Sequence, residues 1–274
     1  MPTGVRGRYV RGFAVGLWML VAATAVAAPD TGGVAENVAR PEAGWFRRLA
    51  ALSGIGRPPP VVALDPGHGG RDPGASAPDG VYEKRWTLEL ARSLQDCLEG
   101  AGVRAELSRT SDHYVSLRDR AAWANRLGAD LFVSIHLNAV GDAHSALLEV
   151  YRPAPRDPAA RGTVVPGPRH WVPLPDLGVL QDRLGRPQRT AASARLADEL
   201  HRALVGTVGG PGVQDRGVKI AHFMVLRETH MPAVLVEPAT LSNPSQAARL
   251  HDPQFRRRLV QALCTGVLRY LARR

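Results

Sequence analysis

From residue 61 onward, short runs of apolar residues alternate with longer stretches in which apolar residues recur at helical spacing. The short runs predict buried strands, and the longer stretches predict helices with one apolar face. We expect strands at 61–64, 103–107, 131–135, 147–151, 218–220, 223–226 and 233–236. We expect helices at about 90–98, 117–127, 191–205 and 254–271. This alternation predicts a single α/β domain with a mostly parallel, twisted sheet of about six strands and helices on both faces.

A proline-rich segment interrupts this alternation. Residues 153–187 contain eight prolines, which are too many for the interior of a regular helix or strand. A loop this long inside a compact domain is usually functional or disordered. Because the segment lies between an expected strand and an expected helix, we interpret it as an insertion within the domain.

The first residues have the pattern of an export signal. Three arginines precede an uncharged apolar stretch that ends in Ala-Val-Ala at 25–27. This order is typical of a secretory signal peptide, so we expect a signal peptide at 1–27, with a retained membrane anchor as the alternative. Residues 28–59 show little periodicity, and we interpret them as a linker to a folded domain at 60–274.

The chain is basic, with 35 Lys and Arg against 25 Asp and Glu and a net charge of +10. Removal of residues 1–27, which hold three arginines and no acidic residue, leaves 32 − 25 = +7. This charge suits an anionic partner such as nucleic acid, lipid headgroups or an acidic cell-wall polymer, although an arginine-rich solvated surface has the same composition. A periplasmic or secreted location argues against nucleic acid. No later segment is long and apolar enough for stable membrane insertion.

The chain has only two cysteines, Cys97 and Cys264, which excludes a disulfide framework and a four-cysteine zinc site. Both fall on expected helices. We expect buried free thiols, with a disulfide as the alternative because an exported protein can form one.

Candidate ligands and acids follow three of the expected strands. His68 comes shortly after the first strand, His136 directly follows the strand at 131–135, and Glu237 directly follows the last strand. Glu83 comes just before the first expected helix. Ligands of open α/β sheets bind beyond the carboxyl ends of the strands, so these four side chains should meet at one edge. Two imidazoles and one carboxylate can form a catalytic zinc shell with an open position, and a second carboxylate can supply the general base.

The segments around these residues resemble the zinc-dependent N-acetylmuramoyl-L-alanine amidases of the amidase-3 type, the cell-separation amidases of bacteria. The first segment reads Asp65-Pro-Gly-His-Gly-Gly-Arg-Asp-Pro-Gly74 at its centre. The matching segments follow the family order at 62–75, 83–84, 107–112, 117–120, 124–125, 128–139, 216–219, 231–237 and 241–244. The resemblance therefore covers nearly all of the chain after the expected linker.

The resemblance implies that His68, Glu83 and His136 bind zinc and that Glu237 is the catalytic carboxylate. The implied reaction is hydrolysis of the amide between N-acetylmuramic acid and the L-alanine of peptidoglycan stem peptides, in cell-wall remodelling or daughter-cell separation. Glu237 is followed here by Pro-Ala-Thr, where the family usually has a small residue, a glycine and an aromatic residue. A different pocket wall is therefore expected beside Glu237.

The implied partners are peptidoglycan and an activator protein. Some family members carry a regulatory helix that covers the zinc where this chain has its proline-rich insertion, and residues 176–184 could form such a helix. We expect a flexible surface loop instead.

The sequence also fits other functions. An inactive peptidoglycan-binding relative would have lost site residues, whereas all four are present. A zinc carboxypeptidase-type peptidase would share the metal ligands, and a basic nucleic-acid binder would not need them. Asn138 and Arg227 could contact substrate or could only hold loops.

Overall fold

The computed structural model describes residues 58–154, 177–210 and 212–274. By its contacts the chain divides into two units, Met1–Ala39 and Arg40–Arg274, and the described residues all belong to the second. The expected signal peptide at 1–27 and nearly all of the expected linker at 28–59 lie outside the described residues.

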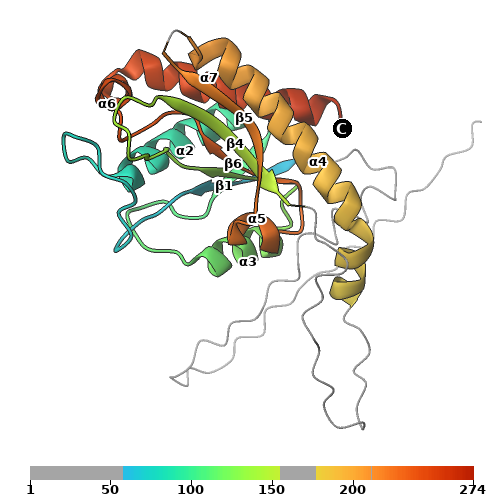
Figure 1. Ribbon diagram of the computed structural model, residues 1–274. Coiled ribbons are helices and arrows are strands. Elements are labelled where there is room, and N and C mark those ends of the chain that lie inside the picture. Colours follow the sequence, from blue (N-terminus) through green and yellow to red (C-terminus); the bar gives the residue numbers. More distant parts are fainter. Residues whose placement is uncertain (1–57, 155–176, 211) are drawn as a thin grey trace, which may run out of the picture. The chain divides into compact units, whose positions relative to one another are not determined.

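The described residues form one six-stranded sheet in the order β2-β1-β3-β6-β4-β5 (Figure 1). The strands are β1 (Val61–Pro66), β2 (Arg104–Leu107), β3 (Leu131–Ile135), β4 (Leu147–Pro153), β5 (Gln214–Ala221) and β6 (Ala233–Glu237). Neighbouring strands are parallel except β4 and β6, which are antiparallel with Glu149 opposite Glu237. The prediction of a single α/β domain with a mostly parallel six-stranded sheet is confirmed.

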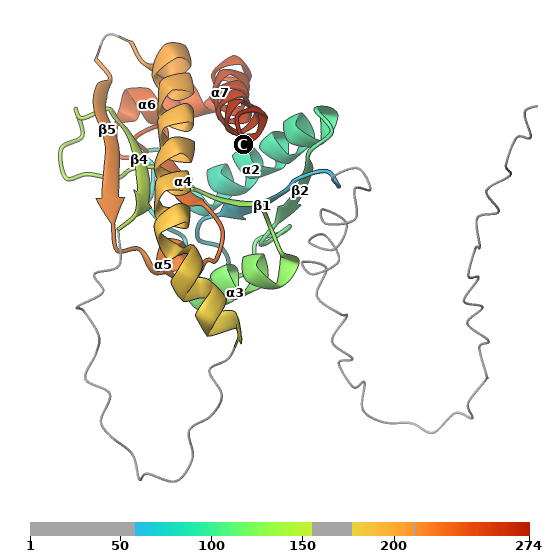
Figure 2. The ribbon, with the colours of Figure 1, turned by 90° about the vertical axis from the view of Figure 1, so that its right-hand side faces the viewer.

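Helices cover both faces of the sheet (Figures 1 and 2). They are α2 (Glu83–Gly100), α3 (Leu117–Leu127), α4 (Leu177–Val208), α5 (Met224–Glu228), α6 (Pro244–His251) and α7 (Pro253–Ala272). Helices α2, α4, α6 and α7 contribute to one core, whereas α3 and α5 contribute to the other. Within the described residues, none of these helices combines the length and the hydropathy needed to cross a bilayer.

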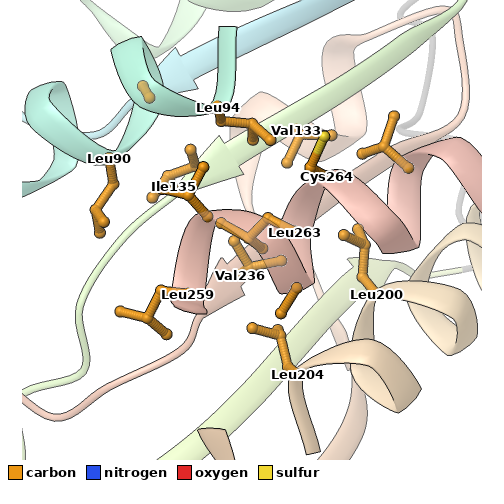
Figure 3. Close-up of a cluster of buried hydrophobic side chains, with 14 of the residues drawn as sticks. Leu90, Leu94, Val133, Ile135, Leu200, Leu204, Val236, Leu259, Leu263 and Cys264 are labelled. Atoms are coloured by element: carbon orange, nitrogen blue, oxygen red, sulfur yellow. The ribbon is translucent and has the colours of Figure 1, made fainter. Parts of the chain in front are cut away.

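Alternating residues of the strands supply the two cores. Val62 and Leu64 of β1 belong to the larger core, and Val61 and Ala63 belong to the smaller one. Figure 3 shows the larger core, in which side chains of α2, α4 and α7 surround those of β3 and β6. Because successive strand residues point to opposite faces, a strand buried on both faces has a continuous apolar run. This explains why the apolar runs predicted the central strands.

The apolar run at 223–226 predicts a strand, and this prediction is wrong. Helix α5 occupies 224–228, and the Arg227 amide donates to the Phe223 carbonyl at 2.9 Å. A four-residue apolar run is compatible with a strand or with one buried helical turn, so periodicity alone does not distinguish them.

Helix α6 is an element that the apolar pattern missed. The Asn243 side chain caps it by accepting a hydrogen bond from the Gln246 amide, and Pro244 occupies its first turn. Asparagine at the cap followed by proline is a common start of a helix, so the local signal was present.

Helix α4 begins at Leu177, inside the proline-rich segment 153–187, and includes Pro187. The structure therefore differs from the loop expectation over 177–187. Only one of the eight prolines falls in this part, and a single proline weakens a helix without excluding it. Residues 155–176 lie outside the described residues.

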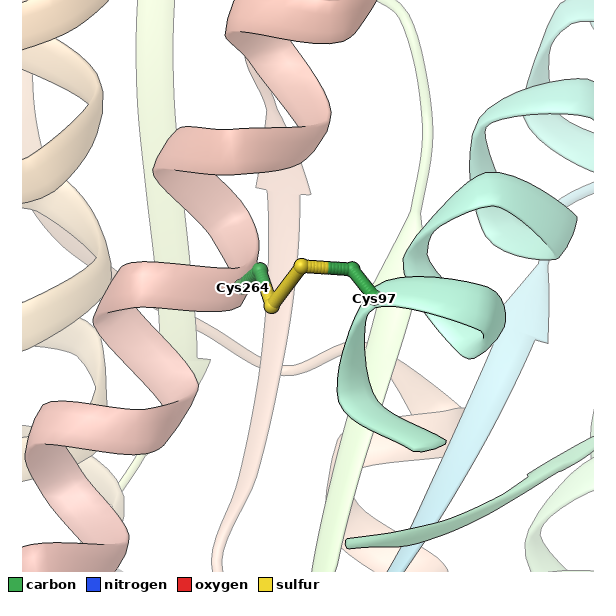
Figure 4. Close-up of a disulfide and its surroundings, with 2 residues drawn as sticks. All are labelled: Cys97 and Cys264. Atoms are coloured by element: carbon green, nitrogen blue, oxygen red, sulfur yellow. A yellow bond between two sulfur atoms is a disulfide. The ribbon is translucent and has the colours of Figure 1, made fainter. Parts of the chain in front are cut away.

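Cys97 of α2 and Cys264 of α7 form a disulfide, with Cα atoms 6.3 Å apart (Figure 4). The expectation of two free thiols is therefore wrong. The two cysteines are separated by 167 positions in the chain, so their proximity depends on how α2 and α7 pack against each other. Sequence spacing carries no information about that contact.

Reduction of this disulfide should destabilise the fold, because a cross-link between distant residues restricts the unfolded chain. We expect the melting temperature to fall by about 5–10 °C, which corresponds to a loss of about 2–4 kcal/mol in the free energy of unfolding. Calorimetry with and without reductant measures the shift. The double variant Cys97→Ser/Cys264→Ser is the control, and reductant should leave its melting temperature unchanged. Equal melting temperatures of oxidised and reduced protein would contradict the expectation.

Candidate active site

The carboxyl ends of β1, β3 and β6 lie side by side because these strands are neighbours and parallel. His68 lies two residues after β1, His136 directly follows β3, and Glu237 is the last residue of β6. Glu83 is the first residue of α2. The helix therefore begins earlier in the chain than the apolar pattern predicts. The four predicted site residues therefore belong to the same edge of the sheet.

His68, Glu83 and His136 form a compact cluster. Each offers one ligand atom, and these atoms lie within 4.8 Å of one another. The Glu83 carboxylate lies between the two imidazoles, 3.1 Å from His68 Nε2 and 3.0 Å from His136 Nδ1. Its side chain also accepts a hydrogen bond from the Leu137 amide at 2.9 Å and is only 5% exposed. Two imidazoles and one buried carboxylate are a donor set suited to a divalent metal ion with an open coordination position.

The charges within the cluster support this interpretation. Burial alone would raise the pKa of Glu83, but hydrogen bonds and the charges of His136 and His68 outweigh it and hold the pKa well below its usual range. Burial also opposes the charged form of His68, but its hydrogen bonds with Glu83 and Asp72 raise its pKa above the ordinary value. The cluster thus holds an ionised carboxylate, the form that binds a metal ion.

Asp72 orients the first histidine, and the sequence analysis missed it. His68 Nδ1 lies 2.9 Å from Asp72 Oδ1, while Nε2 faces Glu83. A carboxylate on the outer nitrogen fixes the ring orientation and the tautomer of a metal-binding histidine. The position of Asp72, four residues after His68 in a glycine-rich turn, was the available signal.

Arg120 holds the backbone of the His68 turn. His68 has a φ of +61°, which is costly for a residue with a side chain. The Arg120 guanidinium donates to the carbonyls of Pro66 at 2.7 Å and His68 at 2.6 Å. Its charge is paired with Asp65 at 2.7 Å, and both side chains are almost fully buried. This buried pair stabilises the turn in the conformation that presents the imidazole.

Arg109 joins two ligand-bearing segments. Its guanidinium donates to the carbonyls of Pro66 at 3.0 Å and Gly67 at 2.9 Å, next to His68. It also donates to the carbonyl of Lys84 at 2.8 Å, one residue after Glu83. Arg109 is 1% exposed. A single buried cation therefore links the turn after β1 to the first turn of α2.

Two glycines allow the side chains of the candidate metal site to approach the backbone closely. A Cβ atom at Gly67 would lie 2.3 Å from the His136 ring. A Cβ atom at Gly74 would lie 2.7 Å from Glu83 Oε2 and 2.7 Å from the His68 ring. Neither distance is compatible with a side chain, so the geometry of the cluster requires glycine at both positions.

Glu237 lies next to the cluster in a partly buried position. The amide of His136 donates to the carbonyl of Val236 at 2.9 Å, which ties the two strand ends together. Burial, followed by the charges of Glu149 and Glu83, raises the pKa of Glu237 to about 7. A carboxyl group with a pKa near neutrality can accept a proton and return it, as a general base requires.

Glu149 is a second buried carboxylate that the sequence analysis did not identify. It lies opposite Glu237 in the β4–β6 pair and is 4% exposed. It accepts hydrogen bonds from Asn138 Nδ2 at 2.6 Å and the Tyr151 hydroxyl at 2.7 Å, and it pairs with Lys219 Nζ. Burial raises its pKa, but these partners outweigh burial and lower the pKa below its ordinary value. The charge of Glu149 therefore favours the protonated form of Glu237.

The fold and the cluster define an α/β protein with a candidate metal centre at the carboxyl edge of its sheet. Residues 62–269 match the Amidase_3 family, described as N-acetylmuramoyl-L-alanine amidase. The chain belongs to this family, which confirms the resemblance drawn from its motifs.

Several proteins similar to this chain are named N-acetylmuramoyl-L-alanine amidases. The chain is 33% identical over 250 residues to the amidase AmiC of Neisseria meningitidis serogroup B, covering 84% of this chain and 58% of that protein. It is 37% identical over 207 residues to the sporulation-specific amidase of Bacillus subtilis, covering 75% of this chain and 64% of that protein. The crystal structure of an N-acetylmuramoyl-L-alanine amidase from Clostridium difficile 630 is similar with a TM-score of 0.62 at 31% identity, covering 78% of this chain and 98% of that one. The chain thus spans less than two thirds of the length of these two sequence relatives.

Substitution of Gly74 by alanine should weaken metal binding. The added Cβ would displace Glu83 and His68, so we expect at least a tenfold loss of affinity, as for other disturbances around metal ligands (about 10–100-fold). Competition with a chromophoric chelator measures the affinity. Gly80→Ala is the matched control, because Gly80 also has a positive φ, +83° against +66° for Gly74, and no atom lies within 4 Å of its Cβ position. Equal affinities of the two variants would contradict this role of Gly74.

Proposed function

We propose that this protein is a zinc-dependent N-acetylmuramoyl-L-alanine amidase. It hydrolyses the amide bond between N-acetylmuramic acid and the L-alanine of peptidoglycan stem peptides, in cell-wall remodelling or daughter-cell separation. The observation that carries the proposal is the convergence of His68, Glu83 and His136 within 4.8 Å, beside a partly buried Glu237, in a chain of the amidase family.

The residues of the cluster fit a zinc ion. His68, Glu83 and His136 would hold it. Asp72 would orient the His68 imidazole through a hydrogen bond to its Nδ1 atom. Zinc, when bound, supplies a Lewis acid that polarises the amide carbonyl and acidifies water. Gly67 and Gly74 keep the space around the ligands free of side chains.

Glu237 acts as the proton carrier of the reaction. Its carboxylate accepts the proton of the water that attacks the carbonyl carbon, and it passes this proton to the nitrogen of L-alanine as the C–N bond breaks. The products are the carboxylic acid of the lactyl group and a stem peptide with a free amino terminus. The neighbouring Glu149 supports the first transfer, because its negative charge raises the proton affinity of Glu237.

The location and the partners belong to the same proposal. The arginines and the apolar stretch within 1–27 support export through a signal peptide, followed by a linker at 28–59 and a catalytic domain at 60–274 that contains the insertion 153–187. Peptidoglycan is the substrate. An activator protein stays a prediction that rests on the resemblance.

The purified protein should release stem peptides with free L-alanine amino termini from sacculi and leave the glycan strands intact. A chelator should abolish this release, and added zinc should restore it, because the cluster needs its metal ion. Mass spectrometry of the soluble products measures the outcome. Stem peptides shortened at the carboxyl end would indicate a peptidase instead, and zinc binding without any product would indicate an inactive wall-binding protein.

The variant Glu237→Gln should keep its zinc and lose most turnover. An amide cannot accept the proton of water, so we expect a loss of about 10²–10⁴-fold in kcat, with unchanged zinc content by elemental analysis. Glu99→Gln, at an exposed position near the end of α2, is the control for the loss of one negative charge. Near wild-type turnover of Glu237→Gln would show that another group is the base.

A further inference from the structure

A hollow of about 820 Å³ lies on the solvent side of α2, close to the metal cluster. Its wall comes from the outer face of α2, from the turn before this helix and from Asp112. Lys84, which lines it, directly follows Glu83, and its Nζ donates to the carbonyl of Gly70 at 2.8 Å, two residues from His68. The hollow therefore adjoins the candidate active site, and its volume is typical of a ligand site (about 300–1,000 Å³).

Both carboxylates on the wall already have cationic partners. Asp112 pairs with Lys84 at 2.7 Å and accepts a hydrogen bond from the Gly70 amide at 2.7 Å. Glu89 pairs with Arg256 of α7 at 2.7 Å. These pairs neutralise the acidic groups and leave the remaining charge of the wall positive.

Arg85 and Arg92 supply this remaining charge. Both are exposed, and neither forms an ion pair with a carboxylate in the part of the chain that the structure describes. The Arg85 guanidinium lies 5.5 Å from the centre of the Trp86 ring, and Arg92 donates to the carbonyl of Thr110. A guanidinium has five N–H donors, so each arginine keeps donors for a ligand in the hollow.

The spacing of the two arginines suits an acidic peptide. They are seven residues apart on one helix, which places them on the same face at a separation of about 10 Å along the axis. An extended peptide advances about 3.3–3.6 Å per residue, so three residues span this separation. Val81, Tyr82 and Leu88 add apolar surface to the wall, against which the peptide backbone and side chains can pack.

We propose that the hollow recognises the free carboxylates of the peptidoglycan stem peptide, with Arg85 and Arg92 as the residues that determine specificity. This inference rests on the proposed amidase function and adds a substrate preference to it. The arginine fork matches the two oxygens of a carboxylate and does not match a carboxamide, which offers one acceptor and no charge. The protein should therefore prefer stem peptides with free carboxylates over amidated ones.

The test compares two soluble muropeptides that differ only in whether their carboxylates are free or amidated. We expect the wild-type protein to have a higher kcat/KM for the free form. Each of Arg85→Gln and Arg92→Gln should lower this preference by about fivefold, the upper range for a partly exposed ion pair. Arg257→Gln removes the same charge from an exposed position on α7 that lines a different hollow, and it should keep the wild-type preference. Melting temperatures report whether the variants are folded.

A second measurement separates this inference from the proposed function. Calorimetric titration of the zinc-loaded protein with the free stem peptide should show binding that weakens about fivefold in Arg85→Gln and Arg92→Gln. If the wild-type protein binds the peptide in this way but cleaves neither muropeptide, the inference holds and the amidase proposal fails. If cleavage occurs but the variants keep the wild-type preference and affinity, the inference is wrong. An equal loss on free and amidated substrates would also overturn it, because that result indicates general electrostatic attraction.

Discussion

The candidate site depends on two buried arginines that bind main-chain carbonyl groups. The carbonyls of residues 66–68 leave the sheet at the end of β1 and need other donors, and Arg109 and Arg120 provide them. The same Arg109 holds the carbonyl of Lys84, so the turn that presents His68 and the helix that begins with Glu83 are linked. A buried carbonyl or a buried guanidinium group without a hydrogen-bond partner lowers the stability of the fold. Loss of either partner would therefore destabilise the other.

Three carboxylates at this edge, two of them buried and one partly buried, have different environments and therefore different pKa values. Glu83 lies between two imidazoles, and Glu149 is surrounded by an amide, a hydroxyl and an ammonium group, so the pKa of each is lowered. Glu237 is partly buried near both charges, and its pKa is raised to about 7. Such divergence between neighbouring acids would give the proposed site an ionised ligand and a proton carrier at the same pH.

The sequence predicted the parts of the site that follow from strand order. His136 and Glu237 come directly after apolar runs and His68 comes shortly after one, and parallel neighbours bring such positions to one edge. The roles of Glu83 and the other ligands came from the family motifs. Buried arginines, the Glu149 network and the Cys97–Cys264 bond were not predictable, because each depends on contacts between distant segments. Short elements such as α5 were also ambiguous, since four apolar residues fit either a strand or a helical turn.

The reversed direction of β4 bears on how the candidate metal site could be covered. Glu149, near the start of β4, lies opposite Glu237 at the cluster edge, so Pro153 at the end of β4 lies toward the opposite edge. Helix α4 then returns along the sheet and ends six residues before Gln214, which pairs with Leu147 near the cluster edge. Both attachment points of the segment between β4 and α4 are therefore remote from the cluster. An autoinhibitory cap built from that segment would therefore have to traverse the full length of the strands.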